Sequence, residues 1–315
     1  MRMPLDIPFG WGALLRRTIK EALADNCVGM AAQLAYYFFL SLFPALLIVV
    51  ALTSFFPSNV LENILDWLGV FTPPEVLQIV RSQIQEIAKS GHGGLITFGL
   101  LGALWSSSSA MSAIIDTLNR AYRVNEARPW WKIQLLAIVL TVVMSVFVVV
   151  SFTLVVSGPE IAQTIAARVG LGPIFAWAWM ILQWPVVFLL ISVAFGLVYF
   201  LAPDAEQRWP WIMPGSRFAT ILWLLISLGF RFYVVHFGQF NKTYGTIGAV
   251  IVVLMWFYLS GLVLLIGAEL NAAIEHASPY GKNEGEKVPG DHRHWLFRTR
   301  RRGGIGETPE PEQTS

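Results

Sequence analysis

Charged residues are scarce in this chain. Asp, Glu, Lys and Arg make up only 13% of its 315 residues, about half of the roughly 25% that ordinary soluble domains carry. Apolar residues make up 55%, and the mean hydropathy is +0.59. So few charges could not cover the surface of a soluble domain of this length, so the composition argues against a soluble enzyme. It also argues against disorder over most of the chain.

Metal ligands and nucleotide-binding motifs are lacking as well. Cys27 is the single cysteine, which excludes an internal disulfide and a thiolate metal cage. No expected membrane span clusters His and carboxylate ligands for metal-dependent hydrolysis, and none places a histidine beside the serines 106–109. The phosphate-binding loop of ATPases is absent, and a net charge of +2 is too small for a dedicated nucleic-acid binder. We therefore expect no enzyme activity, no cofactor, no metal, no ATP and no nucleic-acid partner.

Long stretches without charge are what the chain has instead. They cover residues 26–61, 90–115, 133–159, 169–203 and 243–268. Each exceeds the roughly 20 residues that cross about 30 Å of hydrocarbon, and a sixth apolar pattern continues past two flanking arginines. Backbone in lipid must satisfy its own hydrogen bonds, which favours helices. The sequence therefore predicts an all-α polytopic membrane protein with six transmembrane helices, at 29–56, 94–121, 133–157, 173–202, 211–236 and 245–275.

Amphipathic segments flank these spans at both membrane faces. Residues 11–23 place apolar side chains on one helical face and charges on the other, which is typical of a helix lying on a membrane. In the outer loop, Thr72-Pro73-Pro74-Glu75 has the pattern of a helix start. The chain is thus expected to have an amphipathic cytoplasmic segment 1–28, a six-helix domain 29–276 with an outer amphipathic loop 57–93, and a disordered basic cytoplasmic tail 277–315.

Positive charge sets the expected orientation. Outside the tail, ten Lys and Arg residues fall in segments on the side of the N-terminus and five in the opposite segments. Cytoplasmic loops carry the excess of positive charge, so we expect both termini in the cytoplasm. In the tail, residues 292–302 combine five arginines with aromatic side chains. Beside a membrane this combination favours contact with anionic lipid over RNA, and a plain solvated tail is the alternative.

Polar side chains inside the expected spans gather toward the cytoplasmic side. Such groups are costly in lipid and usually face the bundle interior, so we expect a polar cavity there. Its residues are Gln33, Tyr37, Ser41, Ser109, Ser112, Asp116, Asn119, Arg217, Glu269 and Asn271. Within it, Asp116 or Glu269 is expected to pair with Arg217. A buried network that only holds the helices together explains the same pattern equally well.

The outer face has a smaller set of polar residues. They are Arg231, Asn241 and Lys242. Arg217 and Arg231, at opposite ends of the fifth expected span, suit an anionic lipid headgroup as partner. They equally suit ordinary snorkelling, in which a long side chain carries its charge to the membrane surface.

Three segments resemble the signature motifs of one family. They are AAQLAYYFFLSLFPALL (31–47), ALWSSSSAMSAIIDTLNRAY (103–122) and FNKTYGTIGAVIVVLMWFYLSGLVLLIGAELNAAIE (240–275). In this order they resemble the first, second and last membrane helices of the BrkB/YihY family of bacterial inner-membrane proteins, and the resemblance covers roughly 25–276. It implies six transmembrane helices, cytoplasmic termini and a place in the bacterial inner membrane.

The resemblance implies no settled activity. The family has carried a ribonuclease BN label, generally regarded as a misassignment, and a virulence-factor label, and some members are linked to envelope lipid transport. Two classes of function therefore stay open. One is a transporter or lipid flippase for an anionic envelope lipid or another amphiphile, with membrane lipids as partners. The other is a structural or regulatory envelope protein that transports nothing, with a homo-oligomer as one of its forms.

Overall fold

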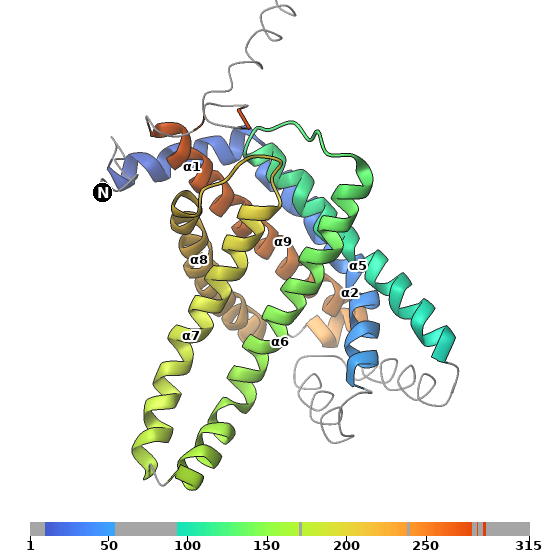
Figure 1. Ribbon diagram of the computed structural model, residues 1–315, viewed down its shortest axis with the longest axis vertical. Coiled ribbons are helices and arrows are strands. Elements are labelled where there is room, and N and C mark those ends of the chain that lie inside the picture. The colour runs from blue at the N-terminus through green and yellow to red at the C-terminus, as the bar shows by residue number, and fades with distance from the viewer. Residues whose placement is uncertain are drawn as a thin grey trace, which may run out of the picture.

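A computed structural model describes most of the chain (Figure 1). The described residues are 10–53, 93–169, 172–237, 240–278, Lys282, Glu286 and Lys287. Within them the chain is helical and contains no strand, so the predicted all-α class is confirmed there. The helices are α1 (Trp11–Ala24), α2 (Cys27–Thr53), α5 (Gly93–Ala121), α6 (Trp130–Val169), α7 (Gly172–Leu201), α8 (Trp209–Phe237) and α9 (Phe240–Ala277).

Four of these helices contain stretches long and apolar enough to cross a membrane. The stretches are Trp130–Val148 in α6, Ile181–Leu201 in α7, Trp209–Val234 in α8 and Val250–Ala277 in α9. Helix α2 contains a shorter apolar stretch, Cys27–Leu42, and α2 and α5 coincide with the first two predicted spans. Several apolar helices are thus confirmed, and four of the six predicted spans are found in the described residues. The predicted outer loop, up to residue 92, and the tail beyond residue 287 lie outside them.

The six long helices form a closed ring. In chain order α2 contacts α5, α5 contacts α6, α6 contacts α7, α7 contacts α8, α8 contacts α9, and α9 returns to α2. Helix α1 lies across one end of this ring, against α9 and α2 (Figure 1). Helix α9 also contacts α5. Helix α9 therefore packs against α1, α2, α5 and α8, more neighbours than the two that the ring order alone would give it. We call it the central helix of the ring.

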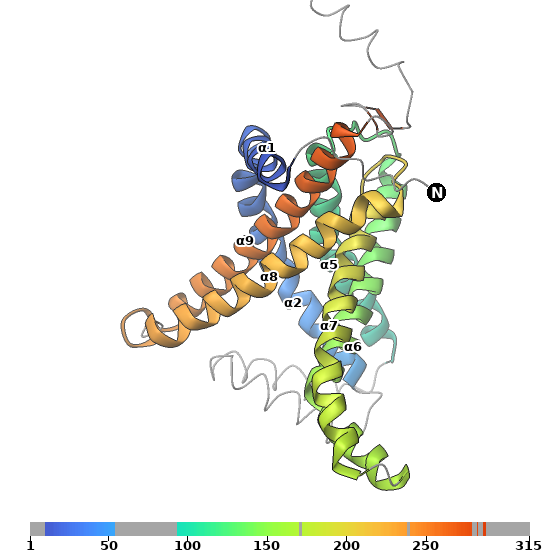
Figure 2. The same ribbon diagram turned by 90° about the vertical axis from the view of Figure 1, so that its left-hand side faces the viewer.

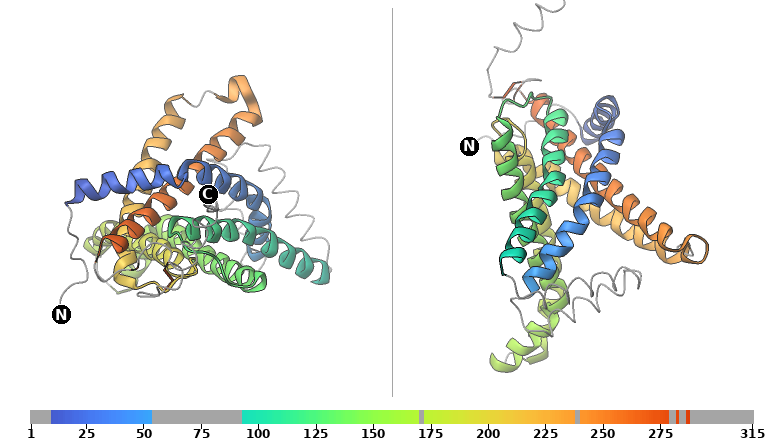
Figure 3. Two further views of the ribbon diagram at one scale, coloured as in Figure 1. Left: turned by 90° about the horizontal axis from the view of Figure 1, so that it is seen from above. Right: turned by 90° about the vertical axis from the view of Figure 1, so that its right-hand side faces the viewer.

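The helices converge at one end of the molecule and diverge toward the other. The converging end carries α1, the connections 122–129 and 202–208, and the last turns of α9 (Figure 2). From there the α6–α7 pair and the α8–α9 pair run in different directions, as both views in Figure 3 also show. Burial follows this arrangement, because none of the described side chains in 221–234 of α8 or 250–260 of α9 is buried. Tight packing is therefore concentrated toward the converging end.

Helices α8 and α9 touch near this end because two glycines face each other. A Cβ atom added to Gly215 would lie 2.3 Å from the carbonyl oxygen of Gly267, and one added to Gly267 would lie 2.4 Å from the hydroxyl oxygen of Tyr199. At Gly215 the obstacle is backbone, so a larger residue fits there only if the two helices move apart. Small residues in membrane helices serve this kind of close approach. The pair of glycines therefore fixes the spacing of α8 and α9.

Helix α1 carries a buried stripe and an exposed apolar stripe. The first stripe is buried and consists of Leu14, Thr18 and Ala22. Leu14 packs there against side chains of α8 and α9, in a cluster with Trp211, Leu270, Ala273 and Ile274. The second stripe is exposed, from 37% to 66%, and consists of Leu15, Ile19 and Leu23. Arg16 and Lys20 are exposed next to it, a pattern typical of a helix at a membrane surface.

Candidate functional site

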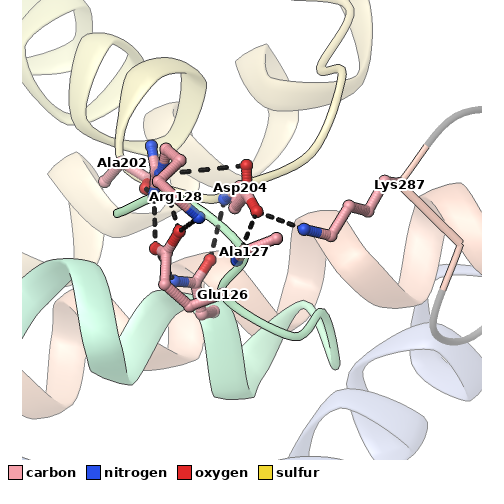
Figure 4. A network of polar contacts seen from close by, with 7 residues as sticks. Glu126, Ala127, Arg128, Ala202, Asp204 and Lys287 are labelled. Carbon is pink, nitrogen blue, oxygen red and sulfur yellow. Dashed lines mark hydrogen bonds and ion pairs between the residues drawn. The ribbon is translucent and has the colours of Figure 1, made fainter. Parts of the chain in front are cut away.

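A network of polar and charged side chains lies at the converging end. We call it the loop network, and it consists of Asn119, Glu126, Arg128, Asp204 and Lys287. Figure 4 labels all of them except Asn119. These residues come from the end of α5, from the α5–α6 and α7–α8 connections, and from the segment after α9. The network therefore joins three parts of the ring that are far apart in sequence.

Asn119 links the two connections. Its Nδ2 donates to Oε2 of Glu126 at 2.8 Å, and its Oδ1 accepts from the backbone amide of Asp204 at 2.8 Å. The side chain is 4% exposed. Buried amide groups are costly unless their donors and acceptors are satisfied. Both ends of the Asn119 amide are satisfied here, so this residue ties the α5–α6 connection to the α7–α8 connection.

Arg128 lies between the two acids of the network. Its guanidinium donates to both carboxylate oxygens of Glu126, at 2.8 and 2.7 Å, and lies 3.7 Å from Asp204. It also donates to the carbonyl of Ala202 at 2.8 Å. The hydrogen bonds to Glu126 raise the pKa of Arg128. Burial raises the pKa of Glu126, but the hydrogen bonds from Arg128 and Asn119 outweigh it, so the net shift is downward.

Asp204 joins the network to the C-terminal segment. Its Oδ2 accepts from the backbone amide of Ala127 at 2.9 Å and pairs with Nζ of Lys287. Figure 4 shows Lys287 reaching Asp204 from the side opposite Arg128. The backbone amide of Glu206 donates in turn to the carbonyl of Lys287 at 2.8 Å. The α7–α8 connection is thus bound on both sides.

A second lysine holds the same segment. Lys282 is 4% exposed, and its Nζ lies 3.4 Å from Glu275 near the end of α9. The same nitrogen donates to the carbonyl of Glu206 at 2.7 Å. Burial lowers the pKa of Lys282, and Glu275 opposes this shift. A buried ammonium group requires such partners, so the local fold depends on Lys282 staying in place.

A second polar group lies buried beside the loop network. We call it the polar core, and it consists of Cys27, Tyr122, Glu269 and Asn271. Glu269 is 1% exposed, and Cys27 Sγ lies at hydrogen-bond distance, 3.5 Å, from its Oε1. Asn271 accepts from the backbone amide of Gly215 at 2.7 Å. Within the described part of the chain, Tyr122 Oη and Asn271 Nδ2 are buried without a hydrogen bond of normal geometry.

The structure separates the predicted cavity residues by exposure. Asn119, Glu269 and Asn271 are buried; Gln33, Tyr37, Ser41 and Ser112 are partly buried; Ser109, Asp116 and Arg217 are exposed. Whether they line a cavity stays a prediction. Of the outer-face residues, Arg231 is exposed in α8, and the side chains of Asn241 and Lys242 lie outside the described residues.

The predicted pairing with Arg217 is not found. Asp116 pairs with Arg120 at 2.9 Å, one helical turn further along α5. Glu269 is in contact with Cys27 instead. Asp116 pairs with Arg120 because residues four apart on an exposed helix face are neighbours. Arg217 lies on the exposed face of α8 and meets neither acid.

Several residues of the loop network, and the Lys282–Glu275 pair beside it, were not predicted as site residues. Glu126 and Asp204 lie in no recognised motif, and Glu275 is only the last residue of the segment 240–275. Arg128, Lys282 and Lys287 counted only toward the orientation. The sequence offered one signal for this site: the short connections 122–129 and 202–208 each contain an acidic residue that could bind a neighbouring cation. In the part of the chain that the structure describes, no group of three or more His, Cys, Asp or Glu side chains could hold a metal ion.

Comparison with known proteins places the chain in a family. The family model described as Virulence factor BrkB matches residues 18–291. The chain belongs to the BrkB family. The resemblance seen in the three sequence segments is thereby confirmed. The BrkB match contains the whole loop network and the whole polar core.

Relatives in the BrkB comparison cover most of the chain. It is 37% identical over 259 residues to "Putative ribonuclease-like protein YfkH" of Bacillus subtilis, a match that covers 82% of this chain and 92% of YfkH. It is 27% identical over 271 residues to UPF0761 membrane protein PSHAa0171 of Pseudoalteromonas translucida, covering 85% and 86%. A UPF0761 membrane protein of Vibrio campbellii is 28% identical over 266 residues, covering 83% and 82%. No solved structure gives a significant match.

Proposed function

We propose that this BrkB-family protein spans the bacterial inner membrane six times, with both termini in the cytoplasm. The spans are the six helices of the ring, α2 and α5 to α9. The converging end is the cytoplasmic end, because the cations Arg123 and Arg128 belong to the 122–129 connection and the cations Lys282 and Lys287 to the segment after α9. Excess positive charge on one side is the usual mark of the cytoplasmic face.

The protein moves an anionic envelope lipid, or another anionic amphiphile, across this membrane. The uneven packing of the ring is the observation that carries the proposal. At the cytoplasmic end the helices are tightly packed and tied by the loop network, whereas 221–234 of α8 and 250–260 of α9 have no buried side chain among those described. Alternating access needs a bundle that is closed at one side and open at the other. The ring has the form of such a state, closed toward the cytoplasm.

Two arginines of α8 are the candidate contacts for the headgroup. Arg231 is exposed in the loosely packed half, and Arg217 is exposed nearer the cytoplasmic end. Arginine donates several hydrogen bonds in a geometry that matches phosphate. Arg231 would meet an anionic headgroup from the outer leaflet, and Arg217 would meet it on the inner side.

A structural or regulatory envelope protein is the second candidate. The satisfied hydrogen bonds of Asn119 and the paired Lys282 favour it, because both have a complete structural explanation. In that case a second copy of the chain would cover the loosely packed halves of α8 and α9. Enzyme activity is not part of either proposal. YfkH is named ribonuclease-like, but RNA hydrolysis by a metal would need clustered ligands.

Capture of a photoreactive lipid tests the transport proposal. The protein is reconstituted in vesicles with phosphatidylglycerol that carries a diazirine in its chain, and labelled residues are located by mass spectrometry. We expect labelling of the partly buried Ile226 and Tyr258, reduced by excess unlabelled phosphatidylglycerol but not by phosphatidylcholine. Exposed Leu228, which faces away from the bundle at 64% exposure, should show no such headgroup preference.

Two results decide between the candidates. Arg231→Gln should abolish the preference for the anionic lipid if Arg231 contacts the headgroup, whereas a snorkelling arginine would leave it unchanged. Equal labelling of all three positions, without headgroup preference, would contradict the transport proposal.

A further inference from the structure

The residues that follow α9 are anchored to the α7–α8 connection at three points. Lys282 Nζ donates to the carbonyl of Glu206, Lys287 Nζ pairs with Asp204, and the carbonyl of Lys287 accepts from the amide of Glu206. Two of the anchors use backbone atoms of the connection, so they depend on its shape as well as on charge. We call the described residues Lys282, Glu286 and Lys287 the C-terminal strap.

The strap completes a circuit around the cytoplasmic end. Lys282 is held by Glu275 of α9, so the strap starts from the central helix. Lys287 reaches Asp204, which also contacts Arg128 and the amide of Ala127 in the α5–α6 connection. Helix α9, the α7–α8 connection and the α5–α6 connection are thereby bound to one another. They cannot separate while all these contacts hold.

The two lysines differ in how easily they can leave. The Lys282–Glu275 pair is almost fully buried, with side chains 3% and 5% exposed, whereas the Lys287–Asp204 pair is 22% and 20% exposed. Breaking a buried pair leaves an uncompensated charge, but a pair that water reaches is weak and reversible. Asp204 would also keep Arg128 as a partner after Lys287 leaves. Lys282 is therefore the fixed attachment and Lys287 the releasable contact.

We infer that the C-terminal strap is a latch: Lys287 holds the cytoplasmic end closed on Asp204, and it has to release before that end can open. This inference rests on the proposed transport function. A closed cytoplasmic end and a loosely packed outer half describe one state of the transporter. The opposite state requires the α7–α8 connection to move away from α9, and the strap opposes this movement because it binds both.

Hydrogen exchange tests the docking of the strap without any transport assay. The full-length protein in vesicles is compared with Lys287→Met, and exchange is followed in the peptide that contains the Glu206 amide. We expect exchange about three- to tenfold faster in the variant, because the contact that orders this amide is lost. The matched control is Lys20→Met, which removes an exposed lysine of α1 and should leave the rate unchanged. An unchanged rate in Lys287→Met would overturn the inference.

Lipid movement tests the latch itself. Fluorescent phosphatidylglycerol is placed in the same vesicles, and its initial rate of movement is compared between the wild type and the two variants. Lys287→Met should be severalfold faster than both others. A wild type that moves lipid at the same rate as Lys287→Met would overturn the latch. Faster exchange at Glu206 without lipid movement in any protein would overturn the proposed transport and leave the strap as a structural clamp.

Discussion

The side-chain oxygen of Asn271 in α9 accepts a hydrogen bond from the backbone amide of Gly215 in α8, 2.7 Å away. This amide lies inside a helix, directly after Pro214. The absence of a side chain at Gly215 lets the Asn271 amide approach, because a Cβ atom there would lie 2.4 Å from its Cγ. A polar side chain of one helix thus holds the backbone of the next, and this contact fixes the central pair of the ring.

Gly215→Ala should therefore destabilise the protein. The added Cβ would meet the Gly267 carbonyl oxygen at 2.3 Å, and backbone cannot move aside as a flexible side chain can. Overpacking of this kind costs about 1–3 kcal/mol or more. We expect a lower thermal unfolding midpoint in detergent. Gly229→Ala is the matched control in the same helix, since nothing lies within 4 Å of its Cβ position. Equal midpoints for the two variants would contradict this account of the interface.

Asn119→Ala and Asp116→Ala should differ clearly, although both change a polar residue near the end of α5. Asn119 is buried with both ends of its amide bonded, so its loss leaves buried groups unpaired and costs about 1–3 kcal/mol. Asp116 and Arg120 are 52% and 60% exposed, and such a pair contributes at most about 0.5 kcal/mol. Yield of folded protein and thermal midpoints measure both. A larger loss for Asp116→Ala would refute this assignment.

Acid should weaken the loop network through Glu126. The hydrogen bonds from Arg128 and Asn119 hold the folded-state pKa of this carboxyl below its ordinary value of 4.5. Its contribution to stability is therefore fully present above that value and is lost as the pH falls through the lowered folded-state pKa. We expect the wild type to lose thermal stability below about pH 4.5 more steeply than Glu126→Gln, which cannot titrate. Parallel curves for the two proteins would show that Glu126 does not set this dependence.

Helix α1 should lie in the membrane interface along its exposed stripe. A nitroxide label at Ile19, introduced after Cys27→Ala, should be more accessible to oxygen than to a water-soluble nickel complex. A label at Arg16 should show the reverse, because the cations face water and headgroups. Power-saturation electron paramagnetic resonance in vesicles measures both accessibilities. Equal accessibility at the two positions would place α1 away from the bilayer.

Much of the fold could be predicted because lipid imposes strong constraints. Charge-free stretches longer than about 20 residues had to become helices, and the predicted bounds 94–121 and 173–202 agree closely with α5 and α7. Helix α6 runs on to Val169, beyond the predicted end at residue 157. Pro159 and Glu160 interrupt the apolar pattern there, but the helix continues through them. Hydropathy therefore predicted the end of the apolar stretch and not the end of the helix.

The site was less predictable because polar pairing depends on contacts between distant segments. Spacing placed Asn119, Glu269 and Asn271 on interior faces, and all three are buried. Spacing could not show that Asp116 and Arg217 lie on exposed faces, since a polar residue near a span end fits either side. The pairing of Asp204 with Lys287 joins residues 83 positions apart. No local pattern predicts such a contact, and only the assembled ring brings the two together.

Movement of an anionic lipid tests the central claim most directly. The protein is reconstituted in vesicles whose inner and outer leaflets both carry fluorescent phosphatidylglycerol, and dithionite is added outside. In protein-free vesicles only the outer label is bleached, so about half of the fluorescence remains. With the protein we predict that fluorescence falls well below half, with or without a proton gradient. Fluorescence that stays at the protein-free level under both conditions would contradict the transport function.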